Sequence, residues 1–150
     1  MKIKTIVTFF LISMLTLGCT EEITDYSTQD LQGVWEGSLN YEFHGGDSDG
    51  TQRTRTSQLT FNADGTLRSI EGHPEFLSNK GSLSVSSNGD ITGVITTNHN
   101  TNPGIETTSE NWDGCNFKSK STIRVNMRWN WTNTRPGSGY VIITGELEKD

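Results

Sequence analysis

Two-residue alternation of apolar and polar side chains is the feature that most constrains how this chain folds. In residues 33–44 the apolar side chains share one face of an extended strand, and these are Trp35, Leu39, Tyr41 and Phe43. Residues 121–132 repeat the pattern, with Ile123, Val125, Met127, Trp129 and Trp131 on one face. One buried face and one solvated face are typical of a β-strand. Because no segment after Gly33 has the apolar spacing of a helix, the sequence predicts an all-β fold.

The same pattern divides the chain into eight strands. They span residues 33–44, 53–62, 66–72, 81–87, 90–97, 106–112, 118–132 and 139–148. The second, fourth and sixth connections are short and contain Asn62–Gly65, Asn88–Gly89 and Asp113–Gly114. Asn-Gly favours a tight hairpin because both central residues of that turn need a positive φ. The other connections are long and span residues 45–52, 73–80, 98–105 and 133–138.

This order of connections predicts how the strands are arranged. Alternate connections of an up-and-down meander lie at opposite ends, so one end carries the tight turns and the other the long loops. The sequence therefore predicts an eight-stranded antiparallel up-and-down barrel with a closed bottom and an open mouth. Such a barrel is nearly filled by side chains or holds one small ligand. A β-sandwich is the alternative fold for the same strands.

Residues 1–18 have the features of an export signal. Lys2 and Lys4 precede an apolar stretch of about a dozen residues, which is shorter than the roughly 20 that span a bilayer. The stretch ends in Gly18-Cys19, which resembles the lipobox of bacterial lipoproteins. The resemblance implies cleavage before Cys19, a diacylglycerol on its sulfur and a membrane anchor. We expect a protein of the bacterial cell envelope, held at the outer membrane on its periplasmic or surface face.

These observations predict three parts: a signal peptide (1–18), a lipidated cysteine with a polar tether (19–27) and a barrel domain (28–150). Acidic residues in the tether resemble the surface-export signals of Bacteroidota lipoproteins. Loss of Lys2 and Lys4 changes the formal net charge from −6 to −8. So acidic a domain is a poor partner for nucleic acid. Lipidation of Cys19, as the resemblance implies, would leave Cys115 without a disulfide partner in the chain, and Cys115 is then expected to be a small packed residue.

The start of the first strand contains a second resemblance. Gly33-Val34-Trp35 resembles the Gly-x-Trp signature that opens lipocalins and related calycin barrels. The resemblance implies a lipocalin-like barrel in which the Trp fills the closed end. Strand count and order extend the likeness over the whole domain, whereas the residue match is limited to Gly33 and Trp35.

Two groups of side chains are candidates for binding. The first is a set of aromatic residues that line a pocket for an apolar ligand or simply form the core, and the set is Trp35, Tyr41, Phe43, Phe61, Trp129 and Trp131. The second is the three histidines His44, His73 and His99, each at or in a long connection. Three imidazoles at one rim suit zinc or copper. Their alternative role is that of ordinary polar loop residues.

No catalytic motif stands out. Residues 46–50 match G-x-S-x-G, but the nucleophile elbow needs a strand, a turn and a helix, and no helix is predicted here. We therefore expect no enzyme and no cofactor. The sequence favours an envelope lipoprotein that binds a small apolar or amphipathic ligand at the open end of its barrel. The alternative is a filled barrel that binds another envelope protein, for example as an inhibitor.

Overall fold

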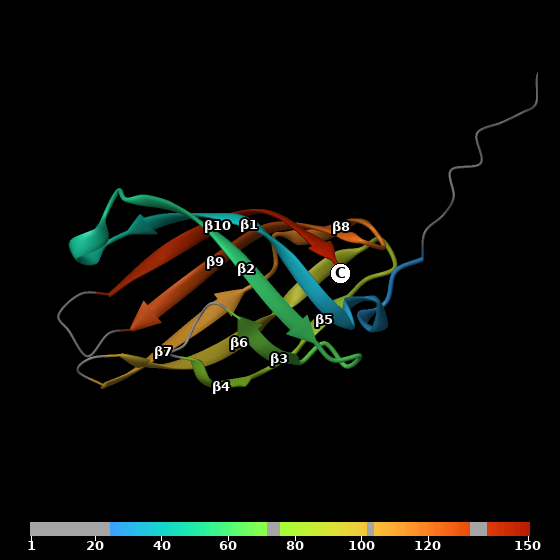
Figure 1. Ribbon diagram of the computed structural model, residues 1–150, viewed down its shortest axis with the longest axis horizontal. Coiled ribbons are helices and arrows are strands. Elements are labelled where there is room, and N and C mark those ends of the chain that lie inside the picture. The colour runs from blue at the N-terminus through green and yellow to red at the C-terminus, as the bar shows by residue number, and fades with distance from the viewer. Residues whose placement is uncertain (1–24, 72–75, 102–103, 133–137) are drawn as a thin grey trace, which may run out of the picture.

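Antiparallel strands make up most of the computed structural model, which describes residues 25–71, 76–101, 104–132 and 138–150. The strands are β1 (Gly33–His44), β2 (Gln52–Phe61), β3 (Leu67–Glu71), β4 (Phe76–Lys80), β5 (Leu83–Val85), β6 (Asp90–Thr101), β7 (Gly104–Asn111), β8 (Cys115–Ser119), β9 (Thr122–Thr132) and β10 (Ser138–Lys149). Two single 3-10 turns accompany them, η1 (Thr28–Leu31) and η2 (Gly46–Ser48). The predicted all-β antiparallel fold is confirmed (Figure 1).

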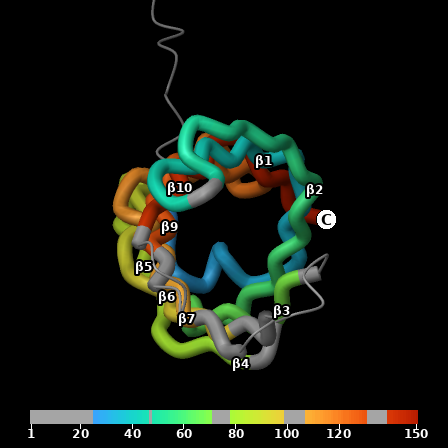
Figure 2. Tube along the Cα trace, turned by 90° about the vertical axis from the view of Figure 1, so that its left-hand side faces the viewer, coloured from blue at the N-terminus to red at the C-terminus, as the bar shows by residue number. Residues whose placement is uncertain are grey.

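The strands follow one another around a ring in the order of the chain. The hydrogen-bonded path runs β3-β2-β1-β10-β9-β7-β6-β4, so the first and last strands are neighbours. β4 and β5 lie end to end along β6, and β7 and β8 lie end to end between β6 and β9. The strands therefore form eight lines in meander order, and Figure 2 shows the ring that they make.

The ring is partial because β3 and β4 are not paired in the described part of the chain. Two hydrogen bonds cross this seam, from the Leu83 N–H to the Gly65 carbonyl and from the Asn79 amide to the Leu67 carbonyl, each 2.9 Å long. β3 pairs only with residues 58–61 of β2, so the described residues leave 52–57 without a strand partner on that side. The fold is thus a barrel-like ring with one seam, and the seam is wider away from Gly65.

Several predicted strand boundaries are wrong, and a side-chain contact explains the one at Asp113–Gly114. Asp113–Gly114 forms a turn closed by the Cys115 N–H and the Trp112 carbonyl (2.9 Å), but it does not reverse the chain. The Asp113 carboxylate accepts the Gly93 N–H (3.1 Å), and the strand line continues into β8. The hairpin lies at Lys120–Ser121, so the predicted strand 118–132 is two strands. The predicted strand 81–87 is also different: it starts earlier, at Phe76, and is interrupted between β4 and β5. Its partner β6 extends to Thr101, beyond the predicted end at residue 97.

The end of the ring where β1 begins is covered by the residues that precede β1, and we call it the closed end. The tight turns before β3, β6 and β9 lie here, and η1 crosses between them (Figure 2). The Thr28 hydroxyl accepts the Val85 N–H (3.1 Å), and the Lys149 ammonium donates to the Asp30 carbonyl (2.9 Å). Tyr26 stacks on Phe117 at 5.0 Å between ring centroids. We call the opposite end, where β1 ends, the distal end.

Large side chains fill the ring at the closed end. Trp35 is fully buried, and its indole N–H donates to the Leu31 carbonyl (2.7 Å). Its ring meets Phe117 edge to face, and Phe61 meets Trp112 in the same way, with 5.7 Å between centroids in both pairs. Trp35 thus belongs to the packed layer at the closed end. Because this packed layer fills the closed end, the distal half of the ring is where we look for a site.

Cys115 belongs to this packed interior. Its side chain is 3% exposed, and its sulfur accepts the Asn126 N–H at 3.4 Å. Burial raises the pKa of the thiol to about 12, so the sulfur stays protonated and unreactive at neutral pH. The expectation of a small packed residue is confirmed, with Cys115 free in the described structure.

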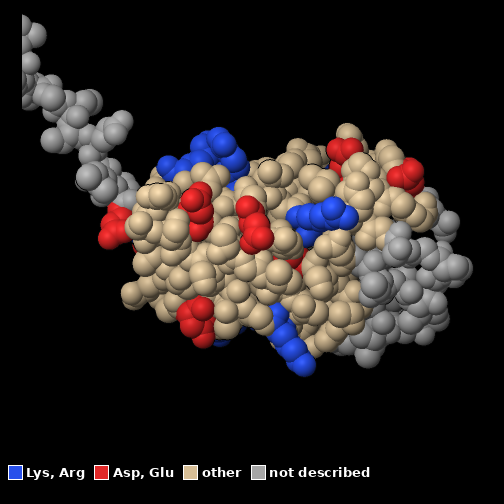
Figure 3. Space-filling view, turned by 180° about the vertical axis from the view of Figure 1, so that it is seen from behind, with Lys and Arg blue, Asp and Glu red and all other residues tan. Residues whose placement is uncertain are grey.

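Charges on the surface are mixed. On the face seen from behind, acidic and basic side chains are interspersed (Figure 3). Lys118 and Glu146 form an exposed ion pair of 2.7 Å between β8 and β10, and exposed pairs of this kind contribute little to stability. No helix in the described residues has the length and apolar character that crossing a membrane requires.

Substituting Gly65 with alanine is expected to destabilise the seam. Gly65 has φ +77°, and an added Cβ would lie 2.1 Å from the Leu83 carbonyl oxygen, so the backbone must move and the Leu83–Gly65 hydrogen bond must lengthen. Gly46→Ala is the matched control, since Gly46 has φ +64° and open space around its Cβ position. Urea unfolding should show a loss of about 1–2 kcal/mol for the control and clearly more for Gly65→Ala. Equal losses would contradict a tight seam.

Candidate functional site

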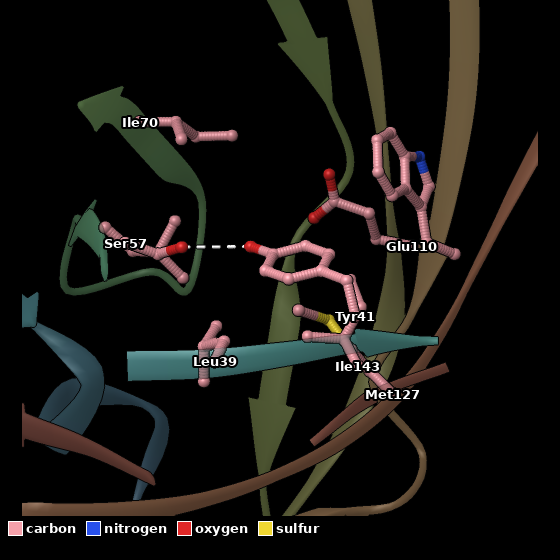
Figure 4. A pocket seen from close by; sticks show the side chains of 9 residues that line it. Leu39, Tyr41, Ser57, Ile70, Glu110, Met127 and Ile143 are labelled. Atoms are coloured by element: carbon pink, nitrogen blue, oxygen red, sulfur yellow. Dashed lines mark hydrogen bonds between the residues drawn. The ribbon is translucent and has the colours of Figure 1, made fainter. Parts of the chain in front are cut away.

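A cavity of about 40 Å³ lies inside the ring on the distal side of the packed layer. Strands from around the ring supply its walls, which consist of Leu39, Tyr41, Ser57, Leu59, Ile70, Glu110, Met127, Trp129 and Ile143 (Figure 4). Most of these side chains are apolar, and three bring polar atoms into the interior. Ile70 and Trp129 are partly buried, whereas the other wall residues are buried.

The first polar contact in the cavity joins β1 to β2. The Tyr41 hydroxyl and the Ser57 hydroxyl are 2.9 Å apart, and the two side chains are 6% and 2% exposed. Burial raises the pKa of Tyr41, while the hydrogen bond with Ser57 opposes the rise. The phenol is therefore neutral at physiological pH, and each hydroxyl keeps a free hydrogen-bonding position for a guest in the cavity.

The second polar group is a buried carboxyl on β7. Glu110 is 9% exposed, and it accepts a hydrogen bond of 3.3 Å from the Thr97 hydroxyl. Thr97 in turn lies 2.6 Å from the Thr108 hydroxyl. No salt bridge reaches Glu110 from the described residues. Burial raises its pKa to about 7, against the opposing effect of the Thr97 and Trp112 side chains, so the carboxyl exchanges a proton near neutral pH.

Two arginines follow Ser57 along the inner face of β2 toward the distal end. Alternation places Arg55 and Arg53 on the same face as Ser57, and both side chains are exposed. The guanidinium carbon of Arg55 lies 6.0 Å from the centroid of the Tyr41 ring, and that of Arg53 lies 5.5 Å from the Phe43 ring. In the described structure neither arginine forms a salt bridge. Positive charge therefore lies beside the cavity, on its distal side.

The predicted aromatic set is divided by depth along the ring. Tyr41 and Trp129 line the cavity. Trp35 and Phe61 do not, because they belong to the packed layer at the closed end. Phe43 is partly buried beneath Arg53, and the side chain of Trp131 lies outside the described residues.

The histidines do not form a site in the described residues. His44 is on the outer face of β1, where its ring stacks on Tyr140 (4.6 Å between centroids) and its Nε2 lies 3.2 Å from the Glu42 carboxylate. His99 lies on β6 opposite Phe76 and Glu106, but its side chain is outside the described residues, as are His73 and Cys19. Within the described ranges no three His, Cys, Asp or Glu residues cluster as metal ligands would. A rim metal site thus stays a prediction.

Ser57 and Glu110 were not singled out by sequence reasoning. Strand alternation could have identified both residues. Ser57 is two residues before Leu59 and four before Phe61, and Glu110 is two before Trp112, so each shares the face of its strand with large apolar side chains. A polar residue at an inward position of a strand marks a buried polar group that needs partners. Arg55, two residues before Ser57, is also at an inward position, but its side chain is exposed.

A second hollow is larger, but the described residues that line it include no buried carboxyl group. It has a volume of about 390 Å³ on the outer face of β1, β2 and β10, and its walls include Asn40, Glu42, Gln52, Thr54 and Thr144. These five side chains are exposed, and Thr54 donates to Asn40 across the strands (2.7 Å). We take the smaller cavity as the candidate site because it alone of the two places a buried ionisable carboxyl against apolar walls.

The comparisons with known proteins give no relative. No family model matches the chain, no curated protein matches it, and no solved structure matches it.

Proposed function

We propose that the chain is a lipid-anchored protein of the bacterial cell envelope that binds a small amphipathic ligand in the distal half of its barrel. The observation that carries the proposal is the cavity, in which Tyr41, Ser57 and Glu110 bring polar atoms to one apolar space. Binding sites of this kind combine apolar walls with a few convergent polar groups that fix the orientation of the ligand.

The size of the cavity limits what enters it. Sites for drug-sized ligands have volumes of roughly 300–1,000 Å³, whereas this cavity has about 40 Å³. It therefore takes one end of a ligand, and the remainder lies on the distal side, against Phe43 and the stems of Arg53 and Arg55. This arrangement favours a ligand with one compact polar end over a wholly apolar one.

A cavity-filling substitution tests the proposal. Ser57→Leu places a larger apolar side chain in the cavity, whereas Thr54→Leu makes the same kind of change on the outer face of the same strand. The full chain, extracted from membranes in mild detergent, is expected to show a non-covalent adduct in native mass spectra. Ser57→Leu should lose the adduct and Thr54→Leu should retain it. Absence of any adduct from the wild-type protein, or equal retention in both variants, would overturn the proposal.

The anchor is expected at Cys19. The described chain enters the domain at Asp25 beside the closed end, where the Tyr26 N–H donates to the Ser87 carbonyl (3.2 Å). An anchor there directs the distal half away from the membrane. Cys19→Ser should move the protein from the membrane fraction to the soluble fraction, since the thioether needs the sulfur. Labelling with a clickable fatty acid should mark the wild-type chain alone, and an unchanged membrane fraction for Cys19→Ser would refute lipidation at this position.

A second candidate function is that of a filled barrel that binds another envelope protein. The small volume of the cavity and the solid layer around Trp35 and Phe61 favour it. Crosslinking in cells followed by pull-down separates the two functions. A stoichiometric protein partner, together with the absence of a small-molecule adduct, would favour the filled barrel.

A further inference from the structure

The described residues that line the cavity include an acid and two aromatic rings but no cation. Glu110 and Tyr41 point into the same space from β7 and β1, and Trp129 forms part of its wall (Figure 4). An ionised carboxylate in an apolar site needs a positive partner, and the described residues supply none by a salt bridge. Aromatic faces attract ammonium groups as well. The chemistry of the walls thus selects a guest that carries positive charge.

The dimensions of the cavity agree with one small cation. Roughly 10–15 Å³ is enough for a single water molecule, and the cavity has about 40 Å³. An ammonium group with its first methylene therefore fits, while a longer chain must extend out of the cavity.

The charge beside the cavity has the opposite sign. Arg55 and Arg53 lie on the inner face of β2, next in line from Ser57, and each guanidinium rests over an aromatic ring. Both are exposed and without a salt bridge in the described structure, although the chain as a whole is acidic. Guanidinium groups bind carboxylates and phosphates through paired N–H donors. An anion is therefore favoured a short distance from the cation site.

Resting on the ligand-binding function proposed above, we propose that the ligand is a short zwitterion, an aminoalkyl carboxylate or phosphate. Its ammonium group lies in the cavity against Glu110, Tyr41 and Trp129. Its anionic group lies outside the cavity on Arg55 and Arg53. The ligand thus supplies the counter-charge that neither end of the site receives through a salt bridge from the described residues.

Four probes with the same four-carbon skeleton test the proposal by calorimetry on the full chain: 4-aminobutyrate, n-butylammonium, butyrate and 1-butanol. We expect 4-aminobutyrate to bind most tightly and n-butylammonium next. Glu110→Gln should weaken both by about tenfold or more, the usual effect of losing a charged hydrogen bond. Glu36→Gln, on the outer face, is the control. Arg55→Gln should weaken 4-aminobutyrate and spare n-butylammonium, while Arg124→Gln should change neither.

The outcomes separate this proposal from the function on which it rests. Butyrate or 1-butanol binding as tightly as 4-aminobutyrate would overturn the zwitterion. So would an adduct in native mass spectra from a protein that binds none of the probes. In both cases ligand binding itself would stand. Failure of every probe, combined with the absence of an adduct, would overturn both proposals.

Discussion

Replacing Glu110 with glutamine is expected to remove a pH dependence of about 3 kcal/mol from the free energy of unfolding. Burial raises the pKa of Glu110 from 4.5 to about 7, so between these values the folded state holds a proton that the unfolded state has released. The protonated carboxyl therefore stabilises the fold fully below pH 4.5. This contribution is lost as the pH rises through about 7.

Urea unfolding at a series of pH values measures this effect. The difference in free energy of unfolding between the wild-type protein and Glu110→Gln should change by about 3 kcal/mol between pH 4 and pH 8. The wild type should become less stable relative to the variant as the pH rises. Glu36→Gln removes an exposed acid from the outer face of β1 and should follow the wild-type curve. A constant difference between wild type and Glu110→Gln across this range would mean that the carboxyl is solvated.

Truncation of Trp35 is expected to cause the largest loss of stability, about 3–5 kcal/mol for Trp35→Ala. The side chain is fully buried, meets Phe117 edge to face and donates its indole N–H to the Leu31 carbonyl. Its removal leaves a cavity and an unpaired carbonyl under η1. The loss is large because the total free energy of unfolding of a protein domain is only about 5–15 kcal/mol.

Val94→Ala is the control for this experiment. Val94 is apolar but 48% exposed, so its truncation should change the stability by less than about 0.5 kcal/mol. Circular dichroism during urea unfolding gives both values. A loss for Trp35→Ala as small as that for Val94→Ala would show that the closed end is not packed as described.

The sequence was sufficient for the strands whose two faces differ most. In β1 and β9 apolar residues alternate with polar ones. β1 has its predicted bounds, and β9 lies within the predicted strand 118–132, whose first residues belong to β8. Asp113–Gly114 misled the prediction because the same dipeptide serves a hairpin or an interruption within a strand. The Gly93 N–H that Asp113 accepts comes from a neighbouring strand, and this partner is not visible in local sequence.

Alternation also indicates which face of a strand a residue occupies but not how deep in the ring it lies. Trp35 and Tyr41 share one face of β1, yet the first fills the closed end and the second lines the cavity. The same holds for the polar residue Glu110, whose face but not whose depth can be read from the sequence. Its inward phase is visible in the sequence, but its distance from Tyr41 depends on pairings between strands that are far apart in the chain.

The most direct test of the candidate site is an NMR titration of the Glu110 side-chain carboxyl carbon in the full chain. The structure predicts a midpoint near pH 7, because the carboxyl is buried and has no cation beside it in the described residues. Saturating n-butylammonium should lower that midpoint, since an ammonium group favours the ionised form. A midpoint near 4.5 that does not respond to n-butylammonium would contradict a buried ligand site at Glu110.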